Sequence, residues 1–515
     1  MHKCAYAQTF ISLGPGVLMK RVMLLCVLVI AIASSLFAVV GQSAESTPGS
    51  PQTLFTNVNV FNGTENRLYP RQNVLVEGNL ITNISDGDIS VGPAATIIDG
   101  GGRTLMPGLI DSHVHFNFMV DGGPAVLEGS TWEEIGSYAV YAAQEWLKNG
   151  FTTARDMCGM HQGLRKVIDK GLIAGPRLYL SGGCLSQTSG HGDFRHESSA
   201  VGQFDRDKSN TINLGMTRVA DGRAAVLEAS RLNFAGGADY LKMLIGGGGS
   251  SEKDPLHSVQ FTPDEVRAAV EAAESWDTYV SAHVYRDKHI QRGLDLGIKV
   301  FDHAQFISEK TAKNLKAKGA FISPNTSGMN PDLLKHPVYG NPAGPQYPKV
   351  IQFMENSKNL FTVLKKVKPK TVFNTDIVFT TGPRMRSHID HEKYFFAQGI
   401  GNFEALKAMT STGGELAALT GENNPYPGKL GVIEEGAYAD ILIVDGNPLE
   451  DIRHSELVKY VMLNGRMYDA ATMNEIGNYD NKRTRFYFEQ PGSGNAWPMD
   501  SRTHGFMHSQ CSCRH

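Results

Sequence analysis

The chain has 515 residues, of which 41% are hydrophobic and 20% charged, and its formal net charge is −3 at pH 7. A single hydrophobic core stops growing at roughly 250–300 residues, so two cores are expected. The small net charge and the lack of Lys/Arg-rich runs exclude nucleic acid as a partner, and the composition is that of a globular protein rather than a disordered chain or a membrane bundle.

An apolar segment near the N-terminus, Val22–Val40, follows two basic residues at positions 20 and 21 and ends in small residues up to Ala44. This order is typical of a secretory signal peptide. Residues 1–44 are therefore predicted to be removed, and the mature chain to be secreted or periplasmic without stable membrane insertion. A retained anchor is the alternative, because the segment approaches the ~20 residues that span a bilayer. Met19 directly precedes the basic pair and is a second candidate start.

Removal of the leader leaves four cysteines, Cys158, Cys184, Cys511 and Cys513. They are too few for a disulfide framework, although an oxidising compartment permits one pair, which the sequence alone does not identify. The C-terminal tail, residues 477–515, contains the last two. Incidental thiols are favoured there over a metal site, because four convergent ligands are not evident. The aromatic residues of the tail indicate either packing against a neighbouring subunit or disorder.

Short runs of β-forming residues, separated by Asn, Gly and Asp turns, occupy residues 52–104, and a similar pattern returns in residues 428–476. Such alternation is typical of antiparallel strands joined by tight turns. We expect the two segments to form one small β-sandwich domain from both ends of the mature chain.

Between these segments, in residues 105–427, apolar strand-like runs alternate with helical patterns, as in a parallel α/β fold. Thr262–Glu265 combines an N-cap, a first-turn proline and a capping-box glutamate, and so marks a helix start. Eight strand–helix units predict a (β/α)8 TIM-type barrel with insertions, the longest between residues 325 and 371, which could form a substrate lid. The predicted strands are Thr104–His115, Phe151–Met157, Arg177–Ser181, Tyr240–Ile245, Tyr279–Val284, Lys299–Ala304, Phe321–Asn325 and Thr371–Asp376.

Polar residues lie at the carboxyl ends of several predicted strands, where barrel enzymes place their active sites. His113 and His115 point to the same side of an extended strand, since side chains alternate with period two, so both can reach one ion. Imidazole and carboxylate are ligands of Zn²⁺ and similar ions. The other polar residues at the predicted strand ends are Lys242, His283, His303 and Asp376.

The stretch Leu105–His115 resembles the first barrel strand of the amidohydrolase superfamily, which reads Pro-Gly-Leu-Ile-Asp-x-His-x-His. The resemblance covers nearly the whole mature chain, including the segment Gly431–Pro448. It implies a site for two divalent metal ions, foremost Zn²⁺, although Mn²⁺ and Co²⁺ accept the same ligands. It also implies a homo-oligomer, because related members assemble in this way.

The resemblance gives each candidate ligand a role. One ion would be held by the His-x-His pair together with Asp376, and the second by His283 and His303. Lys242 would bridge both ions as an N-carboxylated lysine. A bare lysine cation in the apolar run Ala238–Ile245 would be costly to bury, whereas carboxylation makes an anion that two cations neutralise. In the alternative interpretation, the Lys242 side chain points to solvent, and His283 and His303 are hydrogen-bonded residues of the core.

Such a site is expected to hydrolyse the C–N bond of an amide. Water activated between the two ions attacks the carbonyl, while Asp376 acts as general base and then as general acid. Asp302, beside His303, is expected to orient a ligand or a loop rather than to bind metal. Cyclic amidases of the hydantoinase and imidazolonepropionase kind and phosphotriesterases use the same metal site and are alternatives. A catalytically silent scaffold would lack a ligand, and none of the six is missing.

Three segments resemble the branch that holds Xaa-Pro dipeptidases, metallo-carboxypeptidases and ochratoxin-hydrolysing amidases: the run around Lys242, Ser189–Arg195 and Ala282–Tyr285. This implies a small-molecule or dipeptide-like substrate with a free carboxylate, such as an amide of a C-terminal phenylalanine. His191 and Tyr285 are the candidate substrate-binding residues. Alternatively, His191 braces a loop and Tyr285 fills the barrel mouth. The glycine run after Lys242 is expected to be a mobile active-site loop, since no Gly-Lys-Ser/Thr follows it.

Overall fold

The computed structural model describes residues 50–200, 209–335 and 339–478. The predicted signal peptide and the two C-terminal cysteines lie outside these residues. Within the described ranges, no helix is long and apolar enough to cross a membrane.

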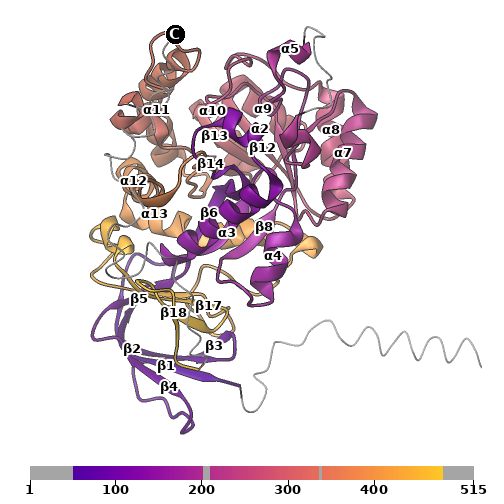
Figure 1. The fold of residues 1–515 in the computed structure, drawn as a ribbon. Coiled ribbons are helices and arrows are strands. Elements are labelled where there is room, and N and C mark those ends of the chain that lie inside the picture. The colour runs from indigo at the N-terminus through magenta and orange to yellow at the C-terminus, as the bar shows by residue number, and fades with distance from the viewer. Residues whose placement is uncertain (1–49, 201–208, 336–338, 479–515) are drawn as a thin grey trace, which may run out of the picture. The chain divides into compact units, whose positions relative to one another are not determined.

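Strands from both ends of the described chain form one nine-stranded sheet (Figure 1). The N-terminal and C-terminal parts of this terminal sheet are joined by antiparallel pairing of β5 with β16. The strands are β1 (Gln52–Val60), β2 (Tyr69–Glu77), β3 (Leu80–Ser85), β4 (Thr96–Asp99), β5 (Thr104–Pro107), β16 (Ile441–Val444), β17 (Val458–Leu463), β18 (Arg466–Asp469) and β19 (Glu475–Ile476).

The apolar run in β16 is continuous because the strand lies between two cores. Ile441 and Ile443 belong to the core of the terminal sheet, whereas Leu442 and Val444 belong to the main core of the barrel. Successive side chains of a strand point to opposite faces, so a strand buried on both faces has no polar positions. Strand β16 therefore attaches the terminal sheet to the barrel.

The barrel strands all pair in parallel, in two sheets that meet at two seams. One seam is bridged by the amide of Asp239, which donates to the Leu180 carbonyl at 2.7 Å, and the other by the amide of Ser112, which donates to the Phe373 carbonyl at 2.9 Å. The expected (β/α)8 barrel is thereby confirmed. Its strands are β6 (Leu109–Val114), β7 (Phe151–Asp156), β8 (Arg177–Leu180), β11 (Leu241–Leu244), β12 (Val280–Arg286), β13 (Val300–Phe306), β14 (Phe321–Pro324) and β15 (Lys370–Thr371), with β9 (Cys184–Ser186) and β10 (Thr217–Val219) as additions.

Two predicted strands differ from those observed. The first is divided at Gly108, so that β5 joins the terminal sheet and β6 the barrel. A Cβ at Gly108 would lie 2.0 Å from the Thr152 hydroxyl oxygen, so only glycine fits this crossing between the two sheets. The last strand, β15, has only two residues, and Asp376 follows it in irregular backbone.

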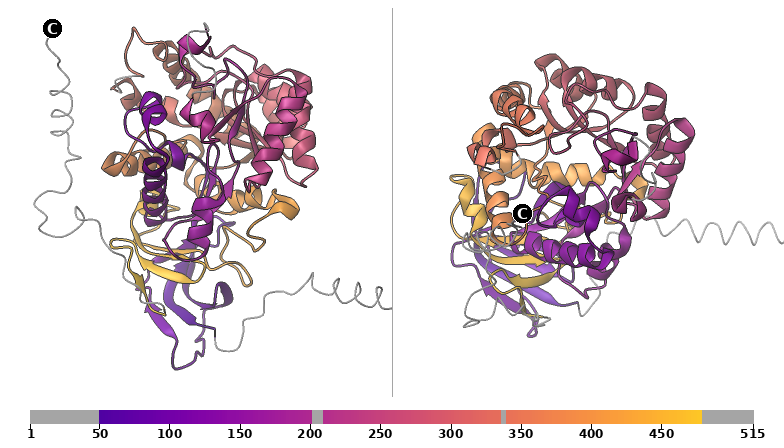
Figure 2. Two further views of the ribbon diagram at one scale, coloured as in Figure 1. Left: turned by 45° about the vertical axis from the view of Figure 1, so that its right-hand side comes forward. Right: turned by 45° about the horizontal axis from the view of Figure 1, so that its top comes forward.

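Helices surround the barrel strands on the outside (Figures 1 and 2). The predicted capping box is present, since the Thr262 side chain accepts from the Glu265 amide at the start of α8. The main helices are α3 (Trp132–Lys148), α4 (Gln162–Asp169), α7 (Arg223–Ala235), α8 (Pro263–Glu274), α9 (Asp287–Asp295), α10 (Glu309–Ala317), α11 (Tyr347–Val367), α12 (Gly382–Ile400), α13 (Asn402–Ala408) and α14 (Ser411–Ala418). Shorter ones are α2 (Pro124–Gly129), α5 (Glu197–Ala200), α6 (Asn210–Asn213), η2 (Phe116–Phe118), η3 (Ser327–Met329), η4 (Pro331–Lys335), η5 (Gly421–Asn423) and η6 (Ile452–Glu456).

Candidate metal centre and active site

A cavity of about 400 Å³ opens at the carboxyl ends of the barrel strands. All of the sequence-predicted site residues line it. The metal-ligand candidates come from five different strand ends, since His113 and His115 share β6, and this is the arrangement that a barrel enzyme uses to converge side chains on one point. The set consists of His113, His115, Lys242, His283, His303 and Asp376, with His191 and Tyr285 beside it.

The His-x-His pair and the aspartate form one compact cluster. The Nε2 atoms of His113 and His115 lie 3.0 Å apart, and the nearer carboxylate oxygen of Asp376 is 3.3 and 3.2 Å from them. The Asp376 amide donates to the His113 carbonyl at 3.0 Å, which fixes the two segments against each other. The fold thus brings together three side chains that could hold one metal ion.

A second cluster lies on the neighbouring strands β12 and β13. His283 Nδ1 is 2.8 Å from His303 Nε2. The Lys242 amine is 2.5 Å from one oxygen of Asp302, whose other oxygen lies 3.4 Å from His113 Nδ1. Asp302 therefore contacts two candidate ligands without facing the cavity, as a residue that orients ligands does.

Backbone strain is concentrated at the same residues. His303, Ala304 and Asp376 have φ angles of 69°, 53° and 51°, in the left-handed region that non-glycine residues rarely adopt. Such conformations persist where the surrounding structure enforces them, and they cluster at functional sites. Here they turn two candidate ligands toward the cavity.

Burial favours the neutral form of three of these histidines. It lowers the pKa of His113 to about 4 and that of His303 to about 3, and it places the pKa of His283 well below its usual value. Burial also raises the pKa of Asp376, but the neighbouring His113 and His303 outweigh it, so this pKa lies well below its ordinary value. Neutral imidazoles beside a carboxylate offer lone pairs to a cation.

The buried polar atoms of the site also fit metal ions. The Nδ1 atoms of His115 and His303 have no hydrogen-bond partner among the described residues. Nε2 of His113, Nε2 of His115 and one Asp376 oxygen lie within 3.3 Å of one another, so their lone pairs face each other. A cation shared by the three atoms would pair with these lone pairs. The donor set therefore suits a divalent ion of the zinc kind.

His191 and Tyr285 flank the second cluster. The His191 ring stacks on His283 at a centroid distance of 4.1 Å, and its Nδ1 lies 2.8 Å from the Ser251 hydroxyl and 3.2 Å from Asp254. Tyr285 stacks on His303 at 4.8 Å. With Nδ1 of His191 engaged, Nε2 is the atom of that ring left for a substrate.

The glycine run after Lys242 is held in place rather than loose. The Gly248 amide donates to Asp254 at 2.6 Å, and the Lys349 ammonium of α11 donates to the carbonyls of Gly248, Ser251 and Asp254 at 2.8, 2.8 and 3.0 Å. The expectation of a mobile loop therefore overlooked contacts from a helix about a hundred residues away in the chain.

Several cavity residues were not identified from the sequence. Asp254 binds His191, and a disulfide joins Cys158 to Cys184 in the cavity wall. Helix α12 lines the cavity with a polar face. The polar residues of this face are three or four positions apart, and this spacing is the sequence pattern from which they could have been identified. This face consists of Arg384, Ser387, His388, His391 and Glu392.

The barrel strand ends bring paired histidines, an aspartate and a buried lysine together in one cavity. This arrangement is typical of the metal-dependent hydrolases that act on amide bonds. A sequence model of the amidohydrolase family matches residues 104–468, and the chain belongs to this family. The expected superfamily is thus confirmed, and the protein is a hydrolytic enzyme.

Three relatives place the chain within the family. Ochratoxinase of Aspergillus niger is 28% identical over 397 residues, covering 72% of this chain and 77% of its own. A prolidase crystallised with N-methylphosphonate-L-proline has a TM-score of 0.73 and 30% identity, over 81% of this chain and 99% of its own. A Xaa-Pro dipeptidase with methionine in its active site has a TM-score of 0.69 and 25% identity, over 81% and 100%. The ochratoxinase and prolidase branch expected from the sequence is confirmed.

Proposed function

We propose that the enzyme hydrolyses an amide bond next to a C-terminal amino acid, as a dipeptidase or carboxypeptidase does, and that N-acyl phenylalanine amides of the ochratoxin type are among its substrates. The observation that carries the proposal is His191, held beside His283 by Asp254 and Ser251 at the edge of the ligand cluster. The similar proteins support it, since they include an ochratoxinase, a prolidase with a proline analogue and a dipeptidase with bound methionine.

We propose Zn²⁺ as the metal, with two ions per chain and Lys242 carboxylated between them. Bound divalent ions polarise the scissile carbonyl and lower the pKa of water towards ~7. Burial lowers the pKa of Lys242, which favours the neutral amine that reacts with carbon dioxide. The His-x-His pair with Asp376 would hold one ion, and His283 with His303 the other.

The chain's own groups move the proton and orient the substrate. Asp376, whose pKa lies well below its ordinary value, is anionic at neutral pH; it accepts a proton from water and delivers it to the leaving amine. Nε2 of His191 and the hydroxyl of Tyr285 supply hydrogen bonds to the carboxylate of the C-terminal residue. Tyr285 contacts both His303 and Phe353, which fixes its ring at the cavity wall.

The test is a substrate screen with metal-loaded protein. It compares dipeptides and N-acyl amino acids of varied C-terminal residue with matched carboxamides, which lack the free carboxylate, and includes hydantoin and paraoxon. We expect turnover of the carboxylate substrates and a large loss of kcat/KM for the carboxamides. Equal rates for acid and carboxamide, or turnover of hydantoin or paraoxon alone, would refute the proposal.

Two further proposals concern the whole chain. We propose that the protein is exported, on the strength of the apolar segment Val22–Val40 and its basic flank. We also propose a homo-oligomer. N-terminal sequencing of the mature protein and light scattering test these two points separately.

A further inference from the structure

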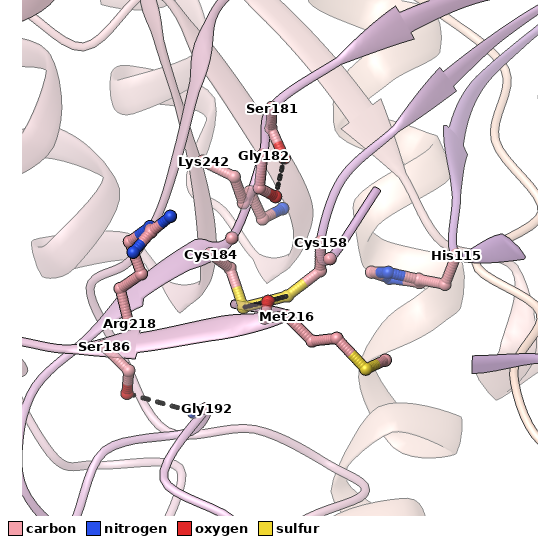
Figure 3. Close-up of a disulfide and its surroundings, with 12 residues drawn as sticks. His115, Cys158, Ser181, Gly182, Cys184, Ser186, Gly192, Met216, Arg218 and Lys242 are labelled. Atoms are coloured by element: carbon pink, nitrogen blue, oxygen red, sulfur yellow. Dashed lines mark hydrogen bonds between the residues drawn. A yellow bond between two sulfur atoms is a disulfide. The ribbon is translucent and has the colours of Figure 1, made fainter. Parts of the chain in front are cut away.

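A disulfide forms part of the wall of the catalytic cavity. Cys158 follows β7, Cys184 opens β9, and their Cα atoms are 4.8 Å apart. Figure 3 shows Lys242 above the bond and His115 to its right, beyond Cys158. The two residues are only 6% and 1% exposed, and both line the cavity. The bond is therefore reached through the cavity that the substrate enters.

The disulfide crosses one of the two seams of the barrel. Cys158 extends from the three-stranded sheet, whereas Cys184 belongs to the seven-stranded sheet. No strand ladder joins the two sheets here in the described part of the chain. At the cavity end, the disulfide is supported by a hydrogen bond from the Gly159 amide to the Gly182 carbonyl at 2.9 Å. The disulfide thus makes the covalent link across the seam where the cavity opens.

On the β9 side the disulfide contacts the turn that carries His191. The Gly192 amide donates to the Ser186 hydroxyl at 3.1 Å. A Cβ added to Gly192 would lie 3.5 Å from the sulfur of Cys184, so the sulfur packs against the backbone directly after His191. Strand β9 pairs with the barrel strand β11 through one residue pair, Leu185 with Met243, and its other ladder is with β10.

On the β7 side the disulfide is connected to the metal centre. The Asp156 carboxylate accepts from the Cys158 amide at 3.2 Å and from the Phe116 amide at 2.9 Å. Phe116 directly follows His115 in the chain. The crosslink therefore ties the segment next to a candidate metal ligand to the segment that carries the candidate substrate-binding histidine.

We propose that the Cys158–Cys184 disulfide is a positioning crosslink that holds the His191 turn against the metal centre, and that a ligand in the cavity shields it from reductants. This inference rests on the proposed function in one respect, that His191 contacts the substrate. Reduction by a small dithiol begins with attack of one of its thiolates on a protein sulfur, which forms a mixed disulfide and frees the first cysteine; the second thiolate of the reductant then attacks the mixed disulfide and frees the other cysteine. The protein gains two thiols, and the reductant becomes a disulfide.

The first test compares the full chain with the double variant Cys158→Ala/Cys184→Ala. Met216→Leu is the matched control, because the Met216 side chain packs in the same apolar cluster, and the backbone carbonyl through which this residue contacts the two sulfurs is kept in the variant. We expect the double variant to keep its metal content and to show an increase in KM of about tenfold with a smaller change in kcat, since one substrate hydrogen bond is misplaced. Unchanged KM and kcat in the double variant would overturn the inference.

The second test does not depend on any substrate. Hydrogen–deuterium exchange of the segment Cys184–Gly192 is measured before and after reduction of the wild-type enzyme, and this measurement also applies if the double variant fails to fold. We expect faster exchange in this segment after reduction, and unchanged exchange would overturn the inference. Faster exchange without turnover of any substrate in the screen would leave the crosslink standing and refute the proposed function instead.

The third test concerns access. Thiols released by a small dithiol are counted over time with and without N-methylphosphonate-L-proline, after binding of this probe has been established by calorimetry. Slower reduction in its presence is expected. An equal rate with the probe bound would show that the disulfide is reached from elsewhere, contrary to the proposal.

Discussion

Lys242 is the residue whose environment depends most on its chemical state. In the apolar strand β11 its amine has Asp302 within 2.5 Å, and burial lowers the pKa of Lys242. Both residues are buried, with exposed fractions of 1% for Lys242 and 0% for Asp302. Carboxylation would convert the cation into an anionic ligand, so the residue links the protein's charge balance to its metal content.

The substitution Lys242→Ala is therefore expected to reduce both metal content and activity. Mutation of a residue that only orients a metal ligand lowers metal affinity or activity by up to about 100-fold. Loss of a bridging ligand should therefore lower kcat/KM by more than this factor. Metal analysis and amide hydrolysis measure the two effects, with the exposed Lys288→Ala as control. A variant that keeps two metals and full rate would contradict the carboxylated-lysine assignment.

Glu392 on α12 predicts a pH dependence of stability. Burial raises its pKa to about 8, an effect that outweighs the hydrogen bond from Thr326, whereas its ordinary value is 4.5. Between these values the folded protein binds more protons than the unfolded chain, so the free energy of unfolding falls as the pH rises from about 4.5 to about 8.

The variant Glu392→Gln should remove this part of the slope. The measurement is the unfolding midpoint of both proteins at several pH values, with equal metal present. We expect the wild type to lose stability relative to the variant towards pH 8. Parallel curves would show that Glu392 titrates alike in the folded and unfolded states.

At the residue level, the sequence indicated the residues of the candidate metal cluster better than those that surround it. The six ligand candidates stand at strand ends, and His113 and His115 share a strand face by simple periodicity. Asp254 and the cysteine pair have no such periodicity. Their partners lie 63 and 26 residues away in the chain, so only the folded structure brings them together.

At the level of elements, α11 is the part of the insertion that acts on the site. It lies in the long segment between β14 and β15, and its residues Val350 and Phe353 line the cavity. Lys349 at its start is buried and holds three carbonyls of the glycine loop. The insertion anticipated as a lid is thus connected to the loop that follows Lys242.

The substitution Lys349→Met is expected to release this loop. Without the three hydrogen bonds, the loop and the neighbouring His191 lose their support, so KM should rise by about tenfold, the effect of one to two hydrogen bonds. Kinetics on the best substrate of the screen measure the effect, with Lys358→Met on the exposed face of the same helix as control. Equal KM values for the two variants would contradict a role for α11 in the site.

The sequence predicted the presence of the barrel strands better than the residues at which they begin and end. Every predicted barrel strand exists, because apolar runs of that length flanked by turns have few other uses in an α/β chain. The division of the first strand at Gly108 depends on the crossing with Thr152, and the shortness of β15 depends on the contacts of Asp376. Both are tertiary effects that local sequence patterns do not carry.

At the scale of the whole molecule, a buried ion pair joins the barrel to the terminal sheet. Arg177 at the start of β8 donates to both oxygens of Asp440 at 2.8 and 3.2 Å, and also to Asn464 at 2.8 Å. Its guanidinium lies 4.2 Å from the centroid of the Tyr438 ring. Burial lowers the pKa of Arg177, but the carboxylate of Asp440 outweighs this effect and raises it.

Removing one partner of this pair should destabilise the whole protein. Arg177→Met leaves the Asp440 carboxylate buried without its cation, at a cost of about 3 kcal/mol in the free energy of unfolding. Thermal or denaturant unfolding measures the loss. The double variant Arg177→Met/Asp440→Asn should recover part of it, since the uncompensated charge is gone. Two separate unfolding transitions in the wild type would show that the sheet and the barrel are not one cooperative unit.

The meeting of both chain ends in the terminal sheet has a consequence for biosynthesis. Translation delivers β5 early, yet one edge of this strand has no neighbour until β16, beginning at Ile441, has left the ribosome. A growing chain therefore cannot bury Leu105 and Met106 on β5 until nearly all of it has been synthesised. Folding of the terminal sheet is therefore postponed to the end of synthesis.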